Sequence, residues 1–409
     1  MNVVLILLRL FAPISIILLM DYYTLQLIYA LLPDNGSILY IYTAIHILIL
    51  VGMIILGRVM SKREGSLRPA LVMFSIFSGI YLTKFVIFLV LFGEDIVRFF
   101  LYTIDYLTDM NPIFLSRIPI VSKLALAAGT TMFGLVAYGM TRGKYRFTLH
   151  RIKIPIVDLP PEFEGFTITQ LSDIHTGSLD SLADVKRGIK MANDLKSDVI
   201  CFTGDIINMS VKELEGFEEI LSSLSAPHGV YSVLGNHDYA DFTERRFSEP
   251  WKKHLEDIIA AHKSFGWKLL MNESEVIRKG DASLAIVGVE NWGRGFSQYG
   301  RLDEAMAKTP KTDVTVLLSH DPSHWDAQIR PNYPNIDLTL SGHTHGLQIG
   351  IDTPYFKFSL SRLVYKQWAD LYKEGEQYIY VNRGFGFHGF FGRIGIWPEI
   401  TQLTLTKAS

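Results

Sequence analysis

The 409-residue sequence contains very little cysteine and almost no net charge, and each absence excludes a class of protein. A single cysteine, Cys201, cannot form an intramolecular disulfide, so a disulfide-stabilised scaffold is excluded. Because Cys201 lies within an apolar run, we expect it to be a small buried core residue. A formal net charge of −2 provides no general basic field, and we expect no nucleic-acid partner.

Long hydrophobic runs, in contrast, fill the first third of the chain. Four apolar stretches cover about residues 3–20, 38–56, 71–92 and 118–140. Each is about as long as a helix that crosses a hydrocarbon layer of ~30 Å. A signal peptide is a competing interpretation of the first stretch, but further spans follow it and no small-residue cleavage site does. We therefore predict a transmembrane anchor of about four helices in residues 1–145 and a soluble domain in residues 146–409.

Lysine and arginine are distributed unevenly over the loops between these stretches. The loop after the first stretch has none, and the loop after the third is net acidic. Basic residues follow the second stretch and cluster again at residues 142–153, after the fourth. Because basic loops stay in the cytoplasm, this pattern predicts a cytoplasmic N-terminus and a cytoplasmic C-terminal domain. Membrane lipids are therefore expected partners.

The rest of the chain alternates between strand-like and helix-like segments. Strand-like runs lie at residues 166–171, 198–203 and 229–234, and helical patterns lie at residues 182–195, 212–224 and 250–265. Later strand-like runs lie at residues 284–289, 314–318, 336–340, 378–381 and 400–406. The first half predicts βαβ units with a largely parallel sheet, and the second half predicts a second sheet packed on the first.

Five of these strand-like runs are followed by side chains that commonly bind metals. The residues are Asp173, His175, Asp205, Asn236, His237, His320, His343 and His345. Functional groups in parallel sheets gather beyond the carboxyl ends of the strands, so we expect the five clusters to converge. Mixed imidazole and carboxylate ligands suit transition metals, and a carboxylate can bridge two cations about 3.5–4 Å apart. We predict two divalent metal ions, with Mn as the expected metal and Fe, Zn or Mg as alternatives.

In order and spacing, these clusters resemble the five signature blocks of the calcineurin-like metallophosphoesterases. The blocks read Asp173-x-His175, Gly204-Asp205, Gly235-Asn236-His237-Asp238, His320 and Gly342-His343-x-His345. The resemblance covers about residue 166 to the C-terminus. It implies a four-layer α/β sandwich, in which helices flank two packed mixed sheets with a dinuclear metal centre at the strand ends. Multi-span members occur in bacteria, so the resemblance also implies a bacterial inner-membrane location.

The resemblance also implies a role for each residue. Asp173, His175 and His345 would hold the first metal, and Asp205 would bridge. Asn236, His320 and His343 would hold the second metal, and His237 would donate a proton or hydrogen bond to the phosphoryl oxygens. One position departs from the family pattern: Asn208 stands where many members have an aspartate. In some members that acid orients the catalytic histidine, and asparagine cannot stabilise an imidazolium by charge.

A loop rich in glycine and phenylalanine, at residues 384–393, has two alternative interpretations. Either it contacts the substrate, with His388 and Arg393 as phosphate donors, or it is a plain packing loop. Its aromatic residues form a candidate apolar surface that enters the membrane interface; they are Phe385, Phe387, Phe390 and Phe391.

The sequence therefore predicts a membrane-anchored phosphoesterase that cleaves phosphodiester or pyrophosphate bonds by attack of a metal-bridging hydroxide. An enzyme tethered at a bilayer meets amphipathic substrates at high effective concentration, so a lipid-linked phosphate is the expected substrate. One alternative is an anchored phosphoprotein or nucleotide phosphatase, and another is a non-catalytic metal-binding membrane sensor. An apolar entrance would favour the lipid, whereas an open charged groove would favour a protein or nucleotide.

Overall fold

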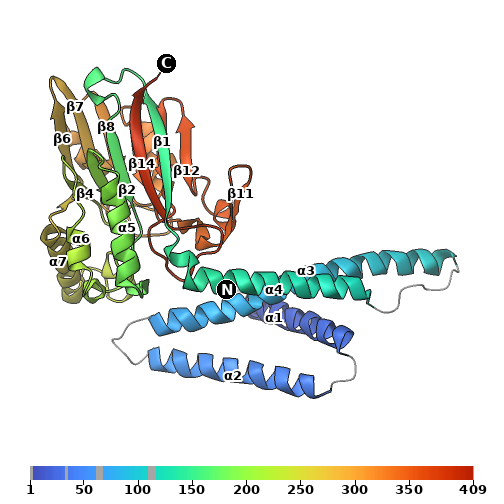
Figure 1. Ribbon diagram of the computed structural model, residues 1–409. Coiled ribbons are helices and arrows are strands. Elements are labelled where there is room, and N and C mark those ends of the chain that lie inside the picture. The colour runs from blue at the N-terminus through green and yellow to red at the C-terminus, as the bar shows by residue number, and fades with distance from the viewer. Residues whose placement is uncertain (1–2, 33–35, 61–67, 109–116, 409) are drawn as a thin grey trace. The chain divides into compact units, whose positions relative to one another are not determined.

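The computed structural model describes residues 3–32, 36–60, 68–108 and 117–408, and the chain divides into two compact units. The first unit comprises Met1–Gly65 and Pro69–Tyr138. The second comprises Ser66–Arg68 and Gly139–Ser409. Figure 1 shows the helical composition of the first unit and the sheets of the second.

Long apolar helices make up the first unit. They are α1 (Val3–Leu31), α2 (Ser37–Met60), α3 (Arg68–Thr108) and α4 (Pro119–Thr141). Among the described residues, α3 and α4 are long and apolar enough to cross a membrane, and Ser15–Leu31 and Ser37–Ile49 are shorter apolar segments. The apolar stretches of the sequence thus fold as helices, as expected of runs without internal charge clusters.

A polar network joins three of these helices. The Lys84 ammonium of α3 lies 2.5 Å from Asp21 Oδ1 of α1 and contacts His46 Nε2 of α2. The Tyr42 hydroxyl of α2 donates to the same carboxylate at 2.8 Å. Polar side chains inside a helix bundle are stable when they bind one another, so this network couples the positions of α1, α2 and α3.

Two six-stranded sheets organise the second unit. The first has the order β1-β14-β2-β3-β4-β5. Its strands are β1 (Thr148–Ile156), β14 (Glu399–Lys407), β2 (Thr167–Leu171), β3 (Val199–Phe202), β4 (Val230–Ser232) and β5 (Lys268–Leu269). Strand β14 runs parallel to β1 and antiparallel to β2, while β2, β3, β4 and β5 are mutually parallel.

The second sheet has the order β12-β13-β9-β8-β7-β6. Its strands are β12 (Asp370–Glu374), β13 (Gln377–Val381), β9 (Leu338–Ser341), β8 (Val314–Leu318), β7 (Ala282–Gly288) and β6 (Glu273–Lys279). The four central strands are parallel, and the two edge strands are antiparallel to their neighbours. A small separate hairpin consists of β10 (Gly350–Asp352) and β11 (Lys357–Ser359), followed by the short helix η8 (Leu360–Leu363).

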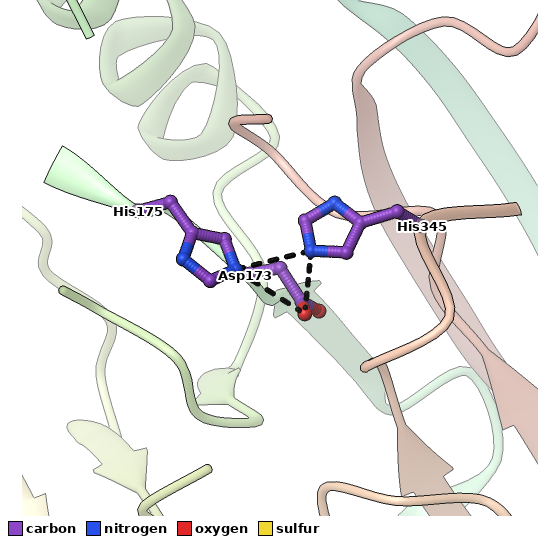
Figure 2. A group of neighbouring side chains, drawn as sticks. All are labelled: Asp173, His175 and His345. Carbon is purple, nitrogen blue, oxygen red and sulfur yellow. Dashed lines mark hydrogen bonds and ion pairs between the residues drawn. The ribbon is translucent and has the colours of Figure 1, made fainter. Parts of the chain in front are cut away.

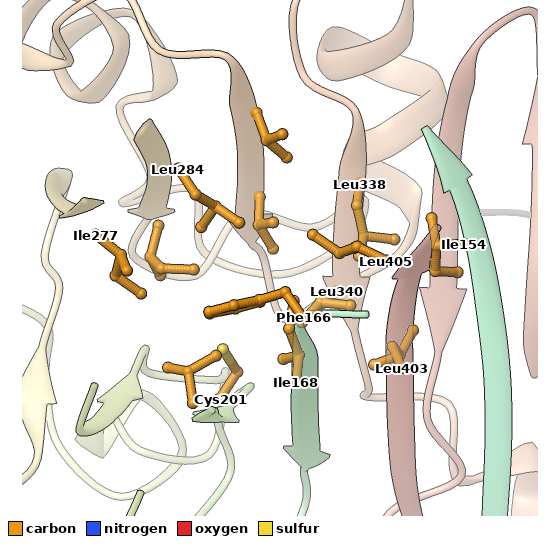
Figure 3. Close-up of a cluster of buried hydrophobic side chains, with 14 of the residues drawn as sticks. Ile154, Phe166, Ile168, Cys201, Ile277, Leu284, Leu338, Leu340, Leu403 and Leu405 are labelled. Carbon is orange, nitrogen blue, oxygen red and sulfur yellow. The ribbon is translucent and has the colours of Figure 1, made fainter. Parts of the chain in front are cut away.

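The main hydrophobic core contains side chains from both sheets (Figure 3). Ile168 and Leu403 belong to the first sheet, Leu284 and Leu340 belong to the second, and all four are fully buried. Cys201 of β3 is also fully buried in this cluster, which confirms its predicted place in the core. Burial of apolar surface between the two sheets is the main favourable term for this arrangement.

Helices α5 (Leu182–Asp194) and α7 (Glu249–Ser264) confirm two predicted helical segments. The third predicted helix, at residues 212–224, is instead divided into η4 (Val211–Leu214) and α6 (Glu218–Ser222). Gly216 interrupts it with a left-handed backbone of φ 84°. The predicted mixed α/β fold with two sheets and flanking helices, after an N-terminal helical region, is confirmed.

Candidate metal centre

The loops that follow five strands bring the predicted metal-binding side chains together. Asp173 and His175 follow β2, Asp205 follows β3, and Asn236 and His237 follow β4. In the second sheet, His320 follows β8, and His343 and His345 follow β9. Each of these strands runs parallel to a neighbour, so their carboxyl ends lie at the same edge of their sheet.

One group of three ligand-type side chains consists of Asp173, His175 and His345 (Figure 2). The Nε2 atoms of the two imidazoles lie 3.0 Å apart. Asp173 Oδ1 lies 3.2 Å from His345 Nε2 and 4.0 Å from His175 Nε2. All three side chains are buried, so their ligand atoms share a small space away from solvent.

A second group consists of Asp205, His320 and His343. Asp205 Oδ2 lies 3.1 Å from His320 Nε2, and His320 Nε2 lies 3.3 Å from His343 Nδ1. The same Asp205 oxygen is only 3.5 Å from His175 Nε2 in the first group. Asp205 is therefore the carboxylate that lies between the two groups.

The protonation of two imidazoles fits metal binding. His175 Nδ1 donates to the Ile207 carbonyl at 3.1 Å, and His320 Nδ1 donates to the Thr203 carbonyl at 2.7 Å. A carbonyl oxygen can only accept, so in the neutral form of either ring Nε2 carries a lone pair. Both lone pairs face the Asp205 carboxylate. Lone pairs and a carboxylate repel one another unless a cation lies between them. Backbone carbonyls that accept from Nδ1, as here, commonly orient metal-binding histidines.

Asn236, which directly precedes His237, provides a further buried hydrogen-bond acceptor. Among the described residues, the side-chain oxygen of Asn236 has no hydrogen-bond partner although the residue is buried. A buried amide oxygen without a partner is costly, and coordination of a cation removes that cost. The carboxylate, imidazole and amide groups therefore fit a pair of divalent cations.

The charges at the centre also favour a cation. Burial by itself lowers the pKa of His320, but the carboxylates of Asp205 and Asp173 outweigh it and raise that pKa to about 10. Burial opposes ionisation of Asp173, yet His345 and His320 hold the pKa of that carboxyl well below its usual range. Two ionised carboxylates thus attract positive charge, and a divalent cation bound by these residues would neutralise them in place of the imidazole proton.

The backbone at the centre is unusual. Five of the candidate ligands have left-handed φ angles between 49° and 69°, and they are Asp173, His175, Asp205, His343 and His345. Residues other than glycine rarely adopt this conformation, and it persists at functional sites because the surrounding structure holds it. Gly342 is part of that structure, because a Cβ there would lie 2.2 Å from Asp173 Oδ2.

No role was assigned from the sequence to two residues that contact the predicted metal ligands or their loops. Asp238 accepts hydrogen bonds from the backbone nitrogens of Asp205 and Gly235, both at 2.8 Å, and so fixes the Asp205 loop. Burial and the Asp205 charge raise the pKa of Asp238 to about 7. Its place in Gly-Asn-His-Asp was a usable signal. The Tyr365 hydroxyl lies 2.8 Å from His343 Nε2, and no motif surrounds it in the sequence.

The structure explains how the ring of His237 is held despite the asparagine at position 208. His237 Nδ1 donates to the backbone carbonyl of Asn208 at 2.8 Å, so the ring is oriented by the main chain. The Asn208 side chain has other partners: its Oδ1 accepts from His388 Nδ1 at 3.1 Å, and its Nδ2 donates to Ser178 Oγ at 3.0 Å. The His388 ring lies 4.3 Å from the His237 ring and stacks on His175 at 4.9 Å between centroids.

The structure does not agree with two other predictions for residues 384–393, the phosphate-donor role of Arg393 and the apolar surface of phenylalanines. Arg393 is fully buried, and its guanidinium donates to the carbonyls of Gly386 and Arg383 at 2.5–2.8 Å. This geometry does not fit a phosphate donor, because its protons are used inside the loop. Phe385 and Phe387 are fully buried and Phe391 nearly so, which makes these three rings core residues, whereas Phe390 is half-buried. The predicted apolar surface of four phenylalanines is therefore wrong.

Comparison with known proteins agrees with this geometry. Residues 166–347 match the family model for the calcineurin-like phosphoesterases, and residues 5–144 match the model described as a probable calcineurin-like phosphoesterase, transmembrane domain. The metallophosphoesterase YkuE of Bacillus subtilis is 30% identical over 297 residues, which cover 70% of this chain and 95% of that protein.

Two other relatives extend the comparison. A Danio rerio transmembrane protein with metallophosphoesterase domain is 29% identical over 284 residues, and the match covers 67% of this chain but only 61% of that protein. The UDP-2,3-diacylglucosamine pyrophosphatase LpxG of Chlamydia muridarum is 26% identical over 275 residues, which cover 56% of this chain and 81% of LpxG. The chain therefore belongs to the calcineurin-like phosphoesterases, a family of metal-dependent phosphoesterases, and carries that family's transmembrane domain.

Proposed function

We propose that this protein is a membrane-anchored phosphoesterase that hydrolyses phosphodiester or pyrophosphate bonds of a lipid-linked substrate. The observation that carries the proposal is the position of Asp205, whose Oδ2 lies within 3.5 Å of an imidazole from each ligand group. Asp173, His175 and His345 are the proposed ligands of one cation, and Asn236, His320 and His343 are those of the other. Mn is the expected metal, with Fe, Zn or Mg as alternatives, because mixed imidazole and carboxylate ligands suit divalent cations of this kind.

The residues of the chain divide the chemical work. The bound cations would supply a water of lowered pKa and neutralise charge on the phosphoryl oxygens. His237 Nδ1–H donates a hydrogen bond to the Asn208 carbonyl, which leaves Nε2 to exchange a proton with the leaving oxygen. His388 lies beside His237 and is proposed to bind a non-reacting phosphoryl oxygen.

Anchoring supports a lipid-linked substrate. The match to a transmembrane domain supports a membrane location, and the basic residues after the second and fourth apolar stretches favour a catalytic domain on the cytoplasmic face. A bacterial inner membrane suits this arrangement. The name of LpxG describes a pyrophosphatase whose substrate carries acyl chains, and a related bond is the proposed target here. Surface tethering raises the effective concentration of such a substrate.

Metal dependence tests this function. Full-length protein purified in detergent and stripped of metal should not hydrolyse bis-(p-nitrophenyl) phosphate, and Mn should restore turnover. His237→Ala should lower kcat by about 100-fold or more, because a positioned proton donor contributes at least that factor. The metal content of this variant, measured by mass spectrometry, should stay unchanged. Stoichiometric metal binding without turnover on any phosphodiester or pyrophosphate would favour the metal-binding sensor and contradict the proposal.

A second prediction concerns His388 and Asn208. His388→Ala should lower kcat/KM by about 10- to 100-fold, as expected for loss of a positioned hydrogen-bonding group. Asn208→Ala should have a similar effect, because its side chain holds the His388 ring. The double variant should lose less than the sum of the two single losses, since the two residues share the hydrogen bond between them.

The matched control is His228→Ala. His228 is half-buried and precedes β4, at the end of the strand opposite to the metal centre. In steady-state kinetics, the His228→Ala variant should have the same kcat/KM as the parent protein. Additive losses from His388→Ala and Asn208→Ala would show that the two residues act separately.

A further inference from the structure

A cluster of exposed apolar side chains in the second unit lies on the hairpin β10–β11 and the helix η8 that follows it. We define the apolar hairpin surface by Ile351, Tyr355, Phe356, Phe358, Leu363 and Val364, which are all exposed. Tyr355 is 99% exposed, Leu363 is 78% exposed and Val364 is 75% exposed. A cluster of large apolar side chains on one short segment marks an interaction surface, whereas single exposed apolar residues are ordinary.

The hairpin has its polar face toward the protein and its apolar face toward solvent. Ile351 is paired with Phe358 across the hairpin, so these two side chains share one face. Asp352 is paired with Lys357 on the opposite face. That face is anchored by ion pairs, from Arg383 Nε to Asp352 Oδ2 at 2.9 Å and from Lys357 to Asp370. A soluble hairpin normally has the reverse arrangement.

Hydrogen bonds fix this hairpin firmly. The Ser359 hydroxyl donates to the Gly346 carbonyl at 2.5 Å, and Gly350 N donates to the Ile394 carbonyl at 2.9 Å. At the tip, Phe356 N donates to Thr353 Oγ1 at 3.0 Å. The apolar side chains are therefore exposed on an ordered element, and they cannot be covered by simple collapse of a loose loop.

The segment that carries this surface begins and ends at the metal centre. Ile351, the first residue of the surface, is six positions after the candidate ligand His345, and Val364, the last, immediately precedes Tyr365. The Tyr365 hydroxyl lies 2.8 Å from Nε2 of the candidate ligand His343. Whatever the apolar hairpin surface contacts is thus connected by short chain segments to both ligand groups.

We infer that the apolar hairpin surface enters the lipid bilayer and places the metal centre at the level of the phospholipid head groups. The transmembrane domain keeps the chain at a membrane, and α4 ends at Thr141 only two residues before the 3-10 helix that starts at Gly143. A lipid surface is therefore always within reach of the second unit. Exposed aromatic and aliphatic side chains with a basic neighbour, Arg362, suit an anionic interface.

This inference rests on the proposed membrane-anchored function and adds where the substrate enters. The head-group phosphate of a lipid would reach the metal centre while its acyl chains stay in the bilayer. We therefore assign the predicted interfacial role to this hairpin rather than to residues 384–393, where Phe385, Phe387 and Phe391 are buried.

Fluorescence quenching tests the position of the surface directly. Cys201 is fully buried, so a cysteine introduced at an exposed position can be labelled selectively in the full-length chain. Leu363→Cys and Tyr355→Cys would carry an environment-sensitive nitrobenzoxadiazole probe in nanodiscs of phosphatidylcholine and phosphatidylglycerol. We expect a blue shift at both positions and strong quenching when doxyl-labelled lipids are included. The matched control is Lys253→Cys on α7, whose side chain is 68% exposed and should show neither effect.

Activity gives an independent measurement. The double variant Tyr355→Glu/Leu363→Glu should lose about tenfold or more in kcat/KM on the p-nitrophenyl ester of phosphatidic acid in nanodiscs, since burial of one leucine side chain alone corresponds to such a factor. Its rate on soluble bis-(p-nitrophenyl) phosphate should be unchanged. An equal loss on both substrates would overturn the inference.

The quenching result does not depend on turnover, so the two proposals fail in different ways. Quenching at positions 355 and 363 in a protein that hydrolyses no phosphoester would uphold the bilayer contact and contradict the proposed function. Unquenched probes in an active enzyme would overturn the bilayer contact alone. If the unquenched cysteines instead form disulfide cross-links between two copies, the surface is a dimer interface and the inference is wrong.

Discussion

Asp205→Ala should abolish hydrolysis and empty both metal positions. Its Oδ2 lies between His320 Nε2 at 3.1 Å and His175 Nε2 at 3.5 Å, so no other side chain can replace its charge toward both ligand groups. Its Oδ1 also accepts from His237 N at 2.8 Å, and loss of that bond releases the loop of the proposed proton donor. We expect kcat to fall by more than about 10,000-fold, because metal ions supply several kcal/mol of transition-state stabilisation.

Asp205→Asn separates charge from shape in this experiment. The amide keeps the size of the side chain but removes the negative charge that two cations would share, so metal content should still fall. Asp194→Asn on α5 is the control, because that carboxylate is 59% exposed and forms an ion pair with Lys190 at the surface. Metal content and phosphodiester turnover are measured on the same preparations. Full occupancy by two metals in Asp205→Ala would show that the bridging assignment is wrong.

The second large effect is on stability, and it arises from Arg383. This arginine is 1% exposed and forms ion pairs with Glu399 at 2.6 Å, Asp370 at 2.8 Å and Asp352 at 2.9 Å. Arg383→Met leaves the fully buried Glu399 carboxylate without its cation. Removal of one partner of a buried ion pair costs about 3–5 kcal/mol in the free energy of unfolding.

Tryptophan emission reports this unfolding selectively, because all six tryptophans lie between residues 251 and 397. Urea titration in detergent should give the predicted loss for Arg383→Met. Lys190→Met removes a cation that is 72% exposed, and its effect should stay below about 1 kcal/mol. Equal unfolding midpoints for the parent and Arg383→Met would contradict the assigned role.

The pH dependence of this loss has a definite sign. Burial alone would raise the pKa of Glu399, but Arg383 outweighs it and lowers that pKa from 4.5 to about 2. A depressed carboxyl pKa contributes stability that is complete above the unfolded value and is lost as the pH falls to the folded value. The difference between the parent and Arg383→Met should therefore be largest above pH 4.5 and shrink toward pH 2.

Local patterns in the sequence predicted much of the catalytic unit. Strands β2, β3 and β8 are short apolar runs with ligand-type residues directly after them, and the regular alternation of such runs with helical segments indicates parallel sheets. The carboxyl ends of parallel strands in one sheet lie at the same edge, so convergence of Asp173 and Asp205 followed from order alone. The approach of His320 depended on how the second sheet packs against the first. The apolar stretches of residues 3–140 were equally plain, because length and hydrophobicity are local properties.

The positions of the loops around the metal centre depend on contacts with segments that are distant in the sequence. His237 is oriented by the main-chain carbonyl of Asn208. Because every residue type has this carbonyl, the contact could not be predicted from the residue at position 208. His388 meets Asn208 across 180 residues of sequence. Strand β14 inserts between β1 and β2, and its parallel pairing with β1 joins segments about 250 residues apart.

The two phenylalanine-rich segments show the same limit most clearly. Residues 384–393 and 351–364 have similar apolar composition, yet Phe385 and Phe387 are buried while Phe356 and Phe358 are exposed. The sequence by itself determined the order of strands, helices and metal-binding side chains, because these depend on neighbours within a few residues. Only the tertiary structure decided which apolar loop is covered and which one faces outward, because burial depends on the distant segments that pack against it.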